Sequence, residues 1–250
     1  MIYCVETGAG RAGTPLVLLH GFGSHAGYWE PLRTYLQDQF HVLAFDLPGH
    51  GRSPLKDEGR PRQVAQALFA ELEERSTGPV HLCGHSMGGA IACVMALENP
   101  QMVKSLTLLA PGGFGPEVNA RLIKRFAAAD SEEELLPLLE PFYGWRKSVP
   151  QGALVELAAS RQHPGVGEHL TALADYLFGD DTQREVGREA VAALEIPVKV
   201  IWGTQDRITP TRQAHKLPGV FAGHIFEGVG HSLADEIPAE IARLLREQMR

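Results

Sequence analysis

Residues 84–89, GHSMGG, place a serine between glycines at the junction of two different sequence patterns. The segment before them, GPVHLC at 78–83, is turn-like and then β-prone, whereas AIACVMALENP at 90–100 is helix-prone and stops at a proline. This change predicts a strand that turns sharply into a helix, with Ser86 at the corner. Side chains at positions 84 and 88 would collide with neighbouring backbone at such a corner, which explains Gly84 and Gly88.

The corner also predicts a chemical role for its serine. The pattern G-x-S-x-G, with a strand before it and a helix after it, is typical of a nucleophilic serine held above a sheet edge. The N-terminus of the following helix favours negative charge that develops there. A serine hydroxyl is nevertheless a poor nucleophile, so the rest of the chain must supply a base and an acid.

Apolar runs and helical segments alternate along both ends of the chain. Because the apolar runs lack polar alternation and are separated by helices, they predict a mostly parallel β-sheet with helices on both faces, an α/β fold. The expected strands lie at 15–21, 41–49, 80–83, 103–111, 198–203 and 224–230.

This alternation is interrupted in the middle of the chain. From about residue 113 to 194 helical segments follow one another, among them 120–129, 131–143 and 154–162. We therefore expect three parts: a core at 1–112, a helical insertion at 113–194, and the rest of the core at 195–250.

Composition excludes several classes of partner. A formal charge of −7 argues against nucleic-acid binding, which needs a basic face, and no apolar run approaches the length of a membrane span. The N-terminal residues have neither a basic start nor a long apolar stretch, so no signal peptide is expected, and three cysteines without CxxC spacing favour a cytoplasmic protein. The histidines show no metal-binding spacing, so we expect no metal, no cofactor and a small-molecule partner. The oligomeric state stays open.

An acid and a base follow two of the later expected strands. Asp206 comes just after the strand at 198–203, and His231 comes just after the strand at 224–230. Because carboxyl ends of parallel strands share one edge, both should lie near Ser86. The chain order Ser, Asp, His is the one expected for this type of serine corner, so these residues are the predicted catalytic triad.

Acyl transfer also needs backbone N–H groups aimed at the oxyanion. The amide of Met87, directly after the serine, is one candidate donor. The glycine-flanked loop in LLHGFG at 18–23 supplies the second, from Phe22.

Three motifs together resemble the α/β-hydrolase fold superfamily over nearly the whole chain: HGFG, GHSMGG and FDLPGHGRS at 45–53. The last looks like the family's loop after its fourth strand. The resemblance implies a helical cap after the sixth core strand, the triad Ser86, Asp206 and His231, and an oxyanion hole from Phe22 and Met87. The size and the DLPGHGRS loop look like small carboxylesterases, which implies hydrolysis of an ester or thioester of a small to medium acyl group.

Two other resemblances keep alternatives open. LLAPGGFGPEVN at 108–119 is similar to meta-cleavage-product C–C hydrolases and to the hydrolase-like domain of some acetoin dehydrogenase acyltransferase components. However, Ser232 follows the histidine where C–C hydrolases usually carry tryptophan, and HGFGSHAG replaces their longer glycine-rich loop, which favours the esterase. A haloalkane dehalogenase is excluded because position 86 is not aspartate. A small-molecule receptor with little turnover is the alternative from a different class.

Several further polar residues are expected to be structural. His20 should make a structural hydrogen bond, Asp46 should shape its own turn, and His85 should point away from the cleft. Asp235 is better explained as a helix-start residue than as the acid of the triad.

Two sets of residues in the insertion have less specific expectations. Its aromatic side chains are expected to form mostly its own core, with one or two at the pocket: Phe126, Phe142, Tyr143, Trp145 and Tyr176. Its cations are expected on solvated helix faces: Arg121, Lys124, Arg125, Arg146, Lys147 and Arg161.

Overall fold

The computed structural model describes residues 1–55 and 59–250. Within them seven strands form one sheet in the order β1-β3-β2-β4-β5-β6-β7, and only the β1–β3 pair is antiparallel. The strands are β1 (Cys4–Thr7), β2 (Leu16–Leu19), β3 (Val42–Phe45), β4 (Val80–His85), β5 (Val103–Leu109), β6 (Val198–Gly203) and β7 (Ala222–Phe226).

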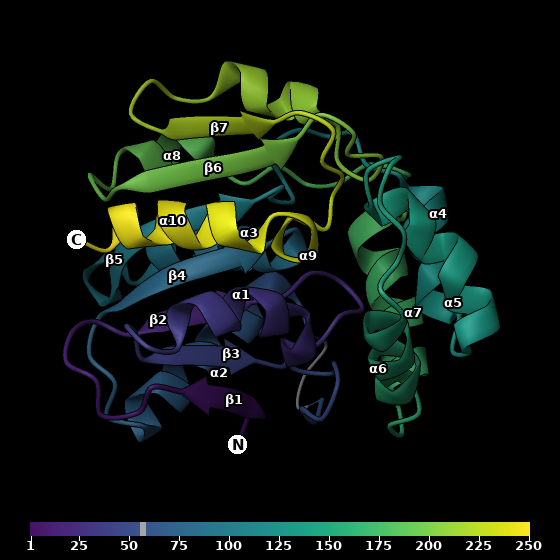
Figure 1. Cartoon of the computed structure of the whole chain (residues 1–250), viewed down its shortest axis with the longest axis horizontal. Coiled ribbons are helices and arrows are strands. Elements are labelled where there is room, and N and C mark those ends of the chain that lie inside the picture. The colour runs from purple at the N-terminus through teal and green to yellow at the C-terminus, as the bar shows by residue number, and fades with distance from the viewer. Residues whose placement is uncertain (56–58) are drawn as a thin grey trace.

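Helices cover both faces of this sheet, which explains why its central strands are continuous apolar runs. Every residue of β2, β3 and β6 is buried, as expected for strands of a parallel sheet covered on both sides. Helices α1 (Glu30–Leu36) and α10 (Pro238–Gln248) lie on one face, and α2 (Pro61–Glu74) and α3 (Met87–Glu98) lie on the other (Figure 1). The predicted α/β fold is confirmed.

The strand count before the insertion is smaller than the resemblance implied. The insertion follows β5, the fifth strand in chain order, not a sixth. The described N-terminal residues form a single short strand, β1, followed by a turn in which Gly8 and Gly10 adopt positive φ. Five strands therefore precede the insertion in this chain, one fewer than the six that the resemblance implied.

Residues 113–194, which we call the insertion, contain α4 (Ala120–Ala128), α5 (Glu132–Leu139), η3 (Glu140–Phe142), α6 (Gln151–Arg161), α7 (Val166–Phe178) and α8 (Arg188–Ala192). Helices α4 to α7 gather beyond the carboxyl ends of the strands, where the arrowheads of β4 and β6 point (Figure 1). Helix α8 instead contacts α3 beside the sheet. The division of the chain into core and cap domains stays a prediction.

Four short elements connect the strands and helices. They are η1 (Ala26–Trp29), η2 (Pro100–Met102), η4 (Thr211–Lys216) and α9 (Leu233–Glu236). All but η2, which leads into the amino end of β5, follow the carboxyl end of a strand. The insertion is attached to the carboxyl edge of the sheet by backbone hydrogen bonds, because the amides of His231 and Ser232 both donate to the carbonyl of Phe142 in η3, at 2.7 and 2.8 Å.

Candidate active site

Ser86 occupies the sharp corner between β4 and α3. Its backbone has φ 52° and ψ −118°, a strained conformation for a residue with a side chain. A Cβ added to Gly84 or Gly88 would overlap neighbouring backbone, so this corner requires glycine at both positions. A Cβ on Gly21 would lie 3.2 Å from the Ser86 Cβ, which places the loop after β2 directly beside the serine.

Asp206 and His231 meet at the same edge of the sheet, after β6 and β7. His231 Nδ1 lies 2.8 Å from Asp206 Oδ2, and both side chains are fully buried. Because the carboxylate oxygen accepts, Nδ1 carries the proton in this hydrogen bond. The second ring nitrogen, Nε2, is therefore left with a lone pair.

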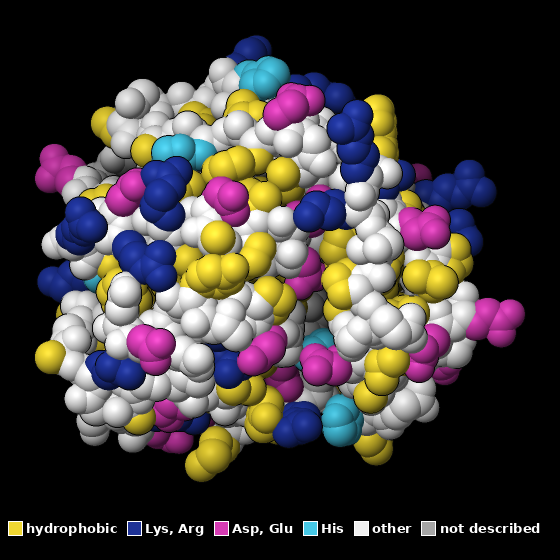
Figure 2. Space-filling model, in the orientation of Figure 1, with side chains coloured by type: hydrophobic (Ala, Val, Ile, Leu, Met, Phe, Trp, Pro, Cys, Tyr) yellow, Lys and Arg dark blue, Asp and Glu magenta, His cyan; other side chains and the backbone are white. Residues whose placement is uncertain are grey.

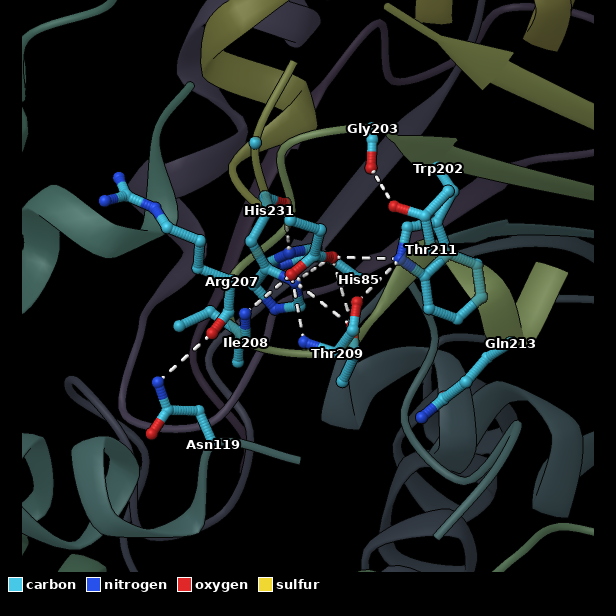
Figure 3. Close-up of polar contacts among 12 residues, drawn as sticks. His85, Asn119, Trp202, Gly203, Arg207, Ile208, Thr209, Thr211, Gln213 and His231 are labelled. Atoms are coloured by element: carbon cyan, nitrogen blue, oxygen red, sulfur yellow. Dashed lines mark hydrogen bonds and ion pairs between the residues drawn. The ribbon is translucent and has the colours of Figure 1, made fainter. Parts of the chain in front are cut away.

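Four further donors hold the Asp206 carboxylate. Oδ1 accepts from the amides of Ile208 at 2.8 Å and Thr209 at 2.9 Å, while Oδ2 accepts from Trp202 Nε1 at 3.0 Å and Thr209 Oγ1 at 3.1 Å. Figure 3 shows Trp202, Ile208 and Thr209 converging beside His231. Such donors are what a buried carboxylate requires, and they fix the direction in which it meets the imidazole.

The Nε2 atom of His231 is buried and has no hydrogen-bond partner among the described residues. No hydrogen bond joins it to Ser86 in this structure. Hydrogen bonds of this kind are often long in a free enzyme and tighten when substrate binds. A free Nε2 opposite an oriented Nδ1 is the arrangement that lets an imidazole accept a proton.

The two predicted oxyanion donors are also free. Within the part of the chain that the structure describes, neither the Phe22 amide nor the Met87 amide donates a hydrogen bond. Met87 is the first residue of α3, and the first amides of a helix have no partner inside it. The arrangement could therefore stabilise an oxyanion near Ser86, although the roles of these residues stay predictions.

His20 and Asp46 have the structural roles expected of them. His20 Nδ1 donates to the Gly21 carbonyl at 2.8 Å, and its Nε2 accepts from the Leu47 amide at 2.9 Å. Both ring nitrogens are thus occupied in the neutral form, and burial lowers the pKa of His20 to about 4. Asp46 accepts from the Arg52 amide at 2.7 Å within its own turn.

His85 lies beside the Asp206–His231 pair, and the expectation that it points away from the cleft is wrong. Its ring centroid is 4.6 Å from that of His231 and 4.8 Å from that of Tyr28, on which it stacks. Nε2 donates to the backbone carbonyl of His231 at 2.9 Å. The sharp corner at the next residue turns the chain away, so the last side chain of β4 packs against the histidine loop.

Asp235 lies in the first turn of α9, as expected, and among the described residues it forms no hydrogen bond or ion pair with His231. It accepts a hydrogen bond from the Tyr143 hydroxyl at 2.6 Å. Burial raises the pKa of Asp235 to about 6, with the nearby carboxylates of Glu236 and Glu156 acting in the same direction.

Two cavities border the Ser86–His231 region. The first, of about 530 Å³, is lined by Ser86, Met87 and Phe22 together with residues of α2, α4 and α7. The second, of about 340 Å³, is lined by His85 and Ser232 and by residues of η1, α4, η3, α6 and α9. Helix α4 contributes Ile123 to the first cavity and Phe126 to the second.

The aromatic residues of the insertion do not all form its core. Phe126 and Tyr143 are buried, and with Phe142 they line the second cavity, whereas Tyr176 lines the first. Trp145 is 75% exposed, so its placement in a core is wrong. It follows η3 in a turn whose backbone is held to the sheet edge, because the Trp145 amide donates to Gln205 Oε1 at 2.7 Å, and its side chain extends into solvent.

Arg161 contradicts the expectation that the cations of the insertion lie on solvated faces. It is 5% exposed, and none of its three guanidinium nitrogens has a hydrogen-bond partner among the described residues. The guanidinium lies 4.7 Å from the Phe126 ring centroid and against Gly23 of the loop after β2. The last turn of α6 packs onto that loop, and this packing removes the side chain from solvent.

Trp202 and Thr209 are site residues that the sequence did not reveal. Trp202 belongs to an apolar strand pattern, and its only signal was that it stands four residues before Asp206. Thr209 follows Asp206 by three residues, the spacing at which a side chain can bond within its own loop.

Several kinds of site are absent from residues 1–55 and 59–250. No three His, Cys, Asp or Glu side chains there are grouped as a metal site. None of the helices in those ranges has the length and apolar character needed to span a bilayer. The three cysteines are unpaired thiols.

Comparisons with known proteins agree on the fold. Residues 16–244 match the model of the alpha/beta hydrolase family. The chain is 33% identical to the dihydrolipoyllysine-residue acetyltransferase component of the acetoin cleaving system of Cupriavidus necator, over 96% of this chain and 64% of that protein. It therefore spans less than two thirds of that relative.

Two further proteins are similar. A monoacylglycerol lipase of Xenopus laevis is 28% identical over 96% of this chain and 77% of its own length. A meta-cleavage product hydrolase from Pseudomonas fluorescens superposes with a TM-score of 0.84 at 20% identity, covering 98% of this chain and 93% of that one. At that identity the superposition supports the fold alone.

Proposed function

The chain belongs to the alpha/beta hydrolase family, and on that premise we propose that it is a serine hydrolase that cleaves an ester or thioester of a small to medium acyl group. Ser86 is the nucleophile, His231 the general base and Asp206 the acid that orients the imidazole. Residues 113–194 act as a cap over the site. In this proposal the substrate is a small molecule, and the reaction needs no cofactor and no metal. Nucleic acid and membranes are not partners, and the protein works in the cytoplasm.

The proposed reaction has two halves. His231 Nε2 accepts the proton of Ser86 Oγ as the oxygen attacks the acyl carbon, and the amides of Phe22 and Met87 bind the oxyanion that forms. The imidazolium then gives that proton to the leaving oxygen, and the ester C–O bond breaks to give an acyl-enzyme. A water molecule, deprotonated by the same imidazole, releases the acid and regenerates Ser86.

One observation supports this proposal most strongly. His231 is buried with Nδ1 on Asp206 at 2.8 Å and Nε2 unpartnered, on the same sheet edge as a serine with positive φ. The buried His50 and His85 also have one unpartnered ring nitrogen, but their other nitrogen bonds a backbone carbonyl, whereas that of His231 bonds a carboxylate. The carboxylate partner is therefore what distinguishes His231 as a candidate base.

The test combines covalent labelling with turnover. A fluorophosphonate probe should modify Ser86 alone, and p-nitrophenyl acetate and butyrate should be hydrolysed over many turnovers. Labelling at a different serine would overturn the assignment. Labelling of Ser86 with a single turnover would favour the receptor alternative instead.

A C–C hydrolase is the second candidate, and the buried Arg161 favours it. Such an enzyme must hold a second carboxylate of its substrate, and an unpartnered guanidinium beside the loop after β2 could do so. Against it stand Ser232 after the histidine and the short loop HGFGSHAG. A 2-hydroxy-6-oxo-dienoate should be hydrolysed far more slowly than p-nitrophenyl butyrate; a higher kcat/KM for the dienoate would select the C–C hydrolase.

A further inference from the structure

The second cavity, of about 340 Å³, lies beside the His231 imidazole, although neither Ser86 nor His231 itself lines it. Its wall includes His85 and Ser232, the chain neighbours of Ser86 and His231, and Phe142, whose ring centroid is 5.6 Å from that of His231. In the proposed hydrolysis the leaving oxygen takes its proton from the imidazole, so the leaving group lies on this side. The cavity is therefore the place for the leaving group, an assignment that rests on the proposed function.

Charged side chains give this cavity a negative character. Its lining contains Asp235, Glu156 and Glu30 but no lysine or arginine. Glu30 is paired with Arg33 at 2.9 Å, whereas Asp235 is bonded to a tyrosine and Glu156 forms no ion pair within the described residues. Asp and Glu side chains border the gap between the insertion and the rest of the molecule in the space-filling view (Figure 2).

Aromatic rings supply the rest of the wall. Tyr28, Phe126, Phe142 and Tyr143 line the cavity. The face of an aromatic ring attracts a cation, with a strength that grows when the cation is removed from water. Arg161 stacks on Phe126 but does not line the cavity, so that space is not already filled by a positive group.

Neither of the two histidines that line the cavity, His25 and His85, carries a positive charge that would repel a cation. His85 is 4% exposed, and because its Nε2 donates to the His231 carbonyl, its unpartnered Nδ1 is an acceptor. His25 Nδ1 accepts from the Gly27 amide, and burial lowers the pKa of His25, so it does not oppose a cation at neutral pH. Carboxylates, ring faces and acceptors together call for a ligand that carries positive charge and N–H donors.

We propose that this cavity binds a protonated amine in the leaving group, so that the substrate is an ester of an amino alcohol. Asp235 and Glu156 pair with the ammonium, and the rings of Tyr28 and Phe142 flank it. During the reaction the acyl C–O bond breaks and the alcohol oxygen takes the proton from His231, while the ammonium keeps its own proton throughout.

The test compares two esters of the same shape. Dimethylaminoethyl butyrate and isoamyl butyrate differ chiefly in a protonated nitrogen that replaces a CH group. After each kcat/KM is divided by the hydroxide rate constant of that ester, to remove the difference in leaving-group quality, the wild type should prefer the amino ester about tenfold or more. Asp235→Asn and Glu156→Gln should each lower this preference at least about threefold.

Glu133→Gln is the matched control, because Glu133 is an exposed acid of the insertion that does not line the cavity. It should retain the preference of the wild type. A normalised ratio near one in the wild type, or the same ratio in Asp235→Asn and Glu133→Gln, would overturn the proposal. If neither ester is hydrolysed and Ser86 is not labelled by fluorophosphonate, the proposed function fails instead.

A binding measurement tests the cavity without turnover. In Ser86→Ala, dimethylaminoethanol should bind more tightly than isoamyl alcohol in an NMR titration, with shifts at residues that line the cavity. Adding Asp235→Asn should remove most of that difference. Equal binding of the two alcohols would contradict the proposal whatever the reaction proves to be.

Discussion

A buried charged group at the carboxyl edge of the sheet and one in the insertion differ in how many hydrogen-bond partners the protein gives them. At the sheet edge, the Asp206 carboxylate accepts five hydrogen bonds from four residues. In the insertion, the buried Arg161 guanidinium has no acceptor at all among the described residues. Because an unpaired buried polar group is costly, the Asp206 carboxylate is satisfied within the protein, whereas the Arg161 guanidinium requires water or a ligand as its partner. In the proposed hydrolysis the reacting groups therefore belong to the sheet edge, and the insertion contributes to substrate selectivity.

Ser86→Ala tests the sheet edge most directly and should have the largest effect. Removing the nucleophile of a triad costs on the order of 10⁶-fold in kcat, and fluorophosphonate labelling should disappear. Phe22→Ala should cost much less, since the backbone amide that would bind the oxyanion survives the substitution. A serine mutant that keeps most of its p-nitrophenyl butyrate turnover would show that the chemistry lies elsewhere.

Asp206→Asn should come next, at roughly 10⁴-fold in kcat, because an amide cannot stabilise the imidazolium or hold the required tautomer. Circular dichroism should show a folded protein. Asp235→Asn, an identical chemical change at the residue bonded to Tyr143, should lower kcat for p-nitrophenyl acetate by less than about tenfold. The reverse ranking would place the acid of the triad on α9 and overturn the comparison.

Trp202→Phe should have an intermediate effect. The ring still fills the buried position, but the N–H bond to Asp206 Oδ2 is lost. Losing one hydrogen bond to a charged group corresponds to about 1.5–3 kcal/mol, and part of that loss should appear as a fall of about tenfold in kcat with little change in KM. Trp202→Leu, which also removes volume, should in addition lower the Tm. An equal kcat for Trp202→Phe and the wild type would show that the donors from Ile208 and Thr209 are sufficient to hold the carboxylate.

The sequence predicted which residues meet at the sheet edge, because each of the three follows a different strand. Ser86, Asp206 and His231 lie after β4, β6 and β7, and parallel strands bring their carboxyl ends together whatever the loops do in detail. The donor from Trp202 was missed because a residue in an apolar strand pattern gives no sign of where its indole N–H points.

The insertion was much less predictable, and the reason is physical. Whether a helix residue is buried depends on which element packs against it, and the pattern within the helix does not contain that information. Arg161 is buried because α6 meets the loop after β2, whereas the Trp145 side chain extends into solvent from a turn whose backbone is held at the sheet edge. The number of strands before the insertion was also unpredictable, because a family resemblance does not determine how many strands these particular N-terminal residues form.

The smallest expected effect concerns the insertion. Replacing Arg161 should change the free energy of unfolding more than it changes kcat. Replacing a buried, incompletely satisfied charge by an apolar side chain of similar length is often neutral or stabilising. Arg161→Met should therefore raise the free energy of unfolding by about 1 kcal/mol, a rise in Tm of about 2–4 °C for a chain of this size. The control Arg125→Met changes an exposed arginine of α4 and should leave the free energy of unfolding within about 0.5 kcal/mol of the wild type.

A fall in Tm of several degrees for Arg161→Met would show that ordered water or a bound anion supplies hydrogen-bond partners to the guanidinium in solution. Arg161 would then be as well satisfied as the Asp206 carboxylate. A rise in Tm combined with a lower kcat/KM for a substrate that carries a carboxylate would identify Arg161 as a group kept unpaired for that substrate. In that case the cost in stability is the consequence of holding an empty site ready, as expected for residues that serve function at the expense of folding.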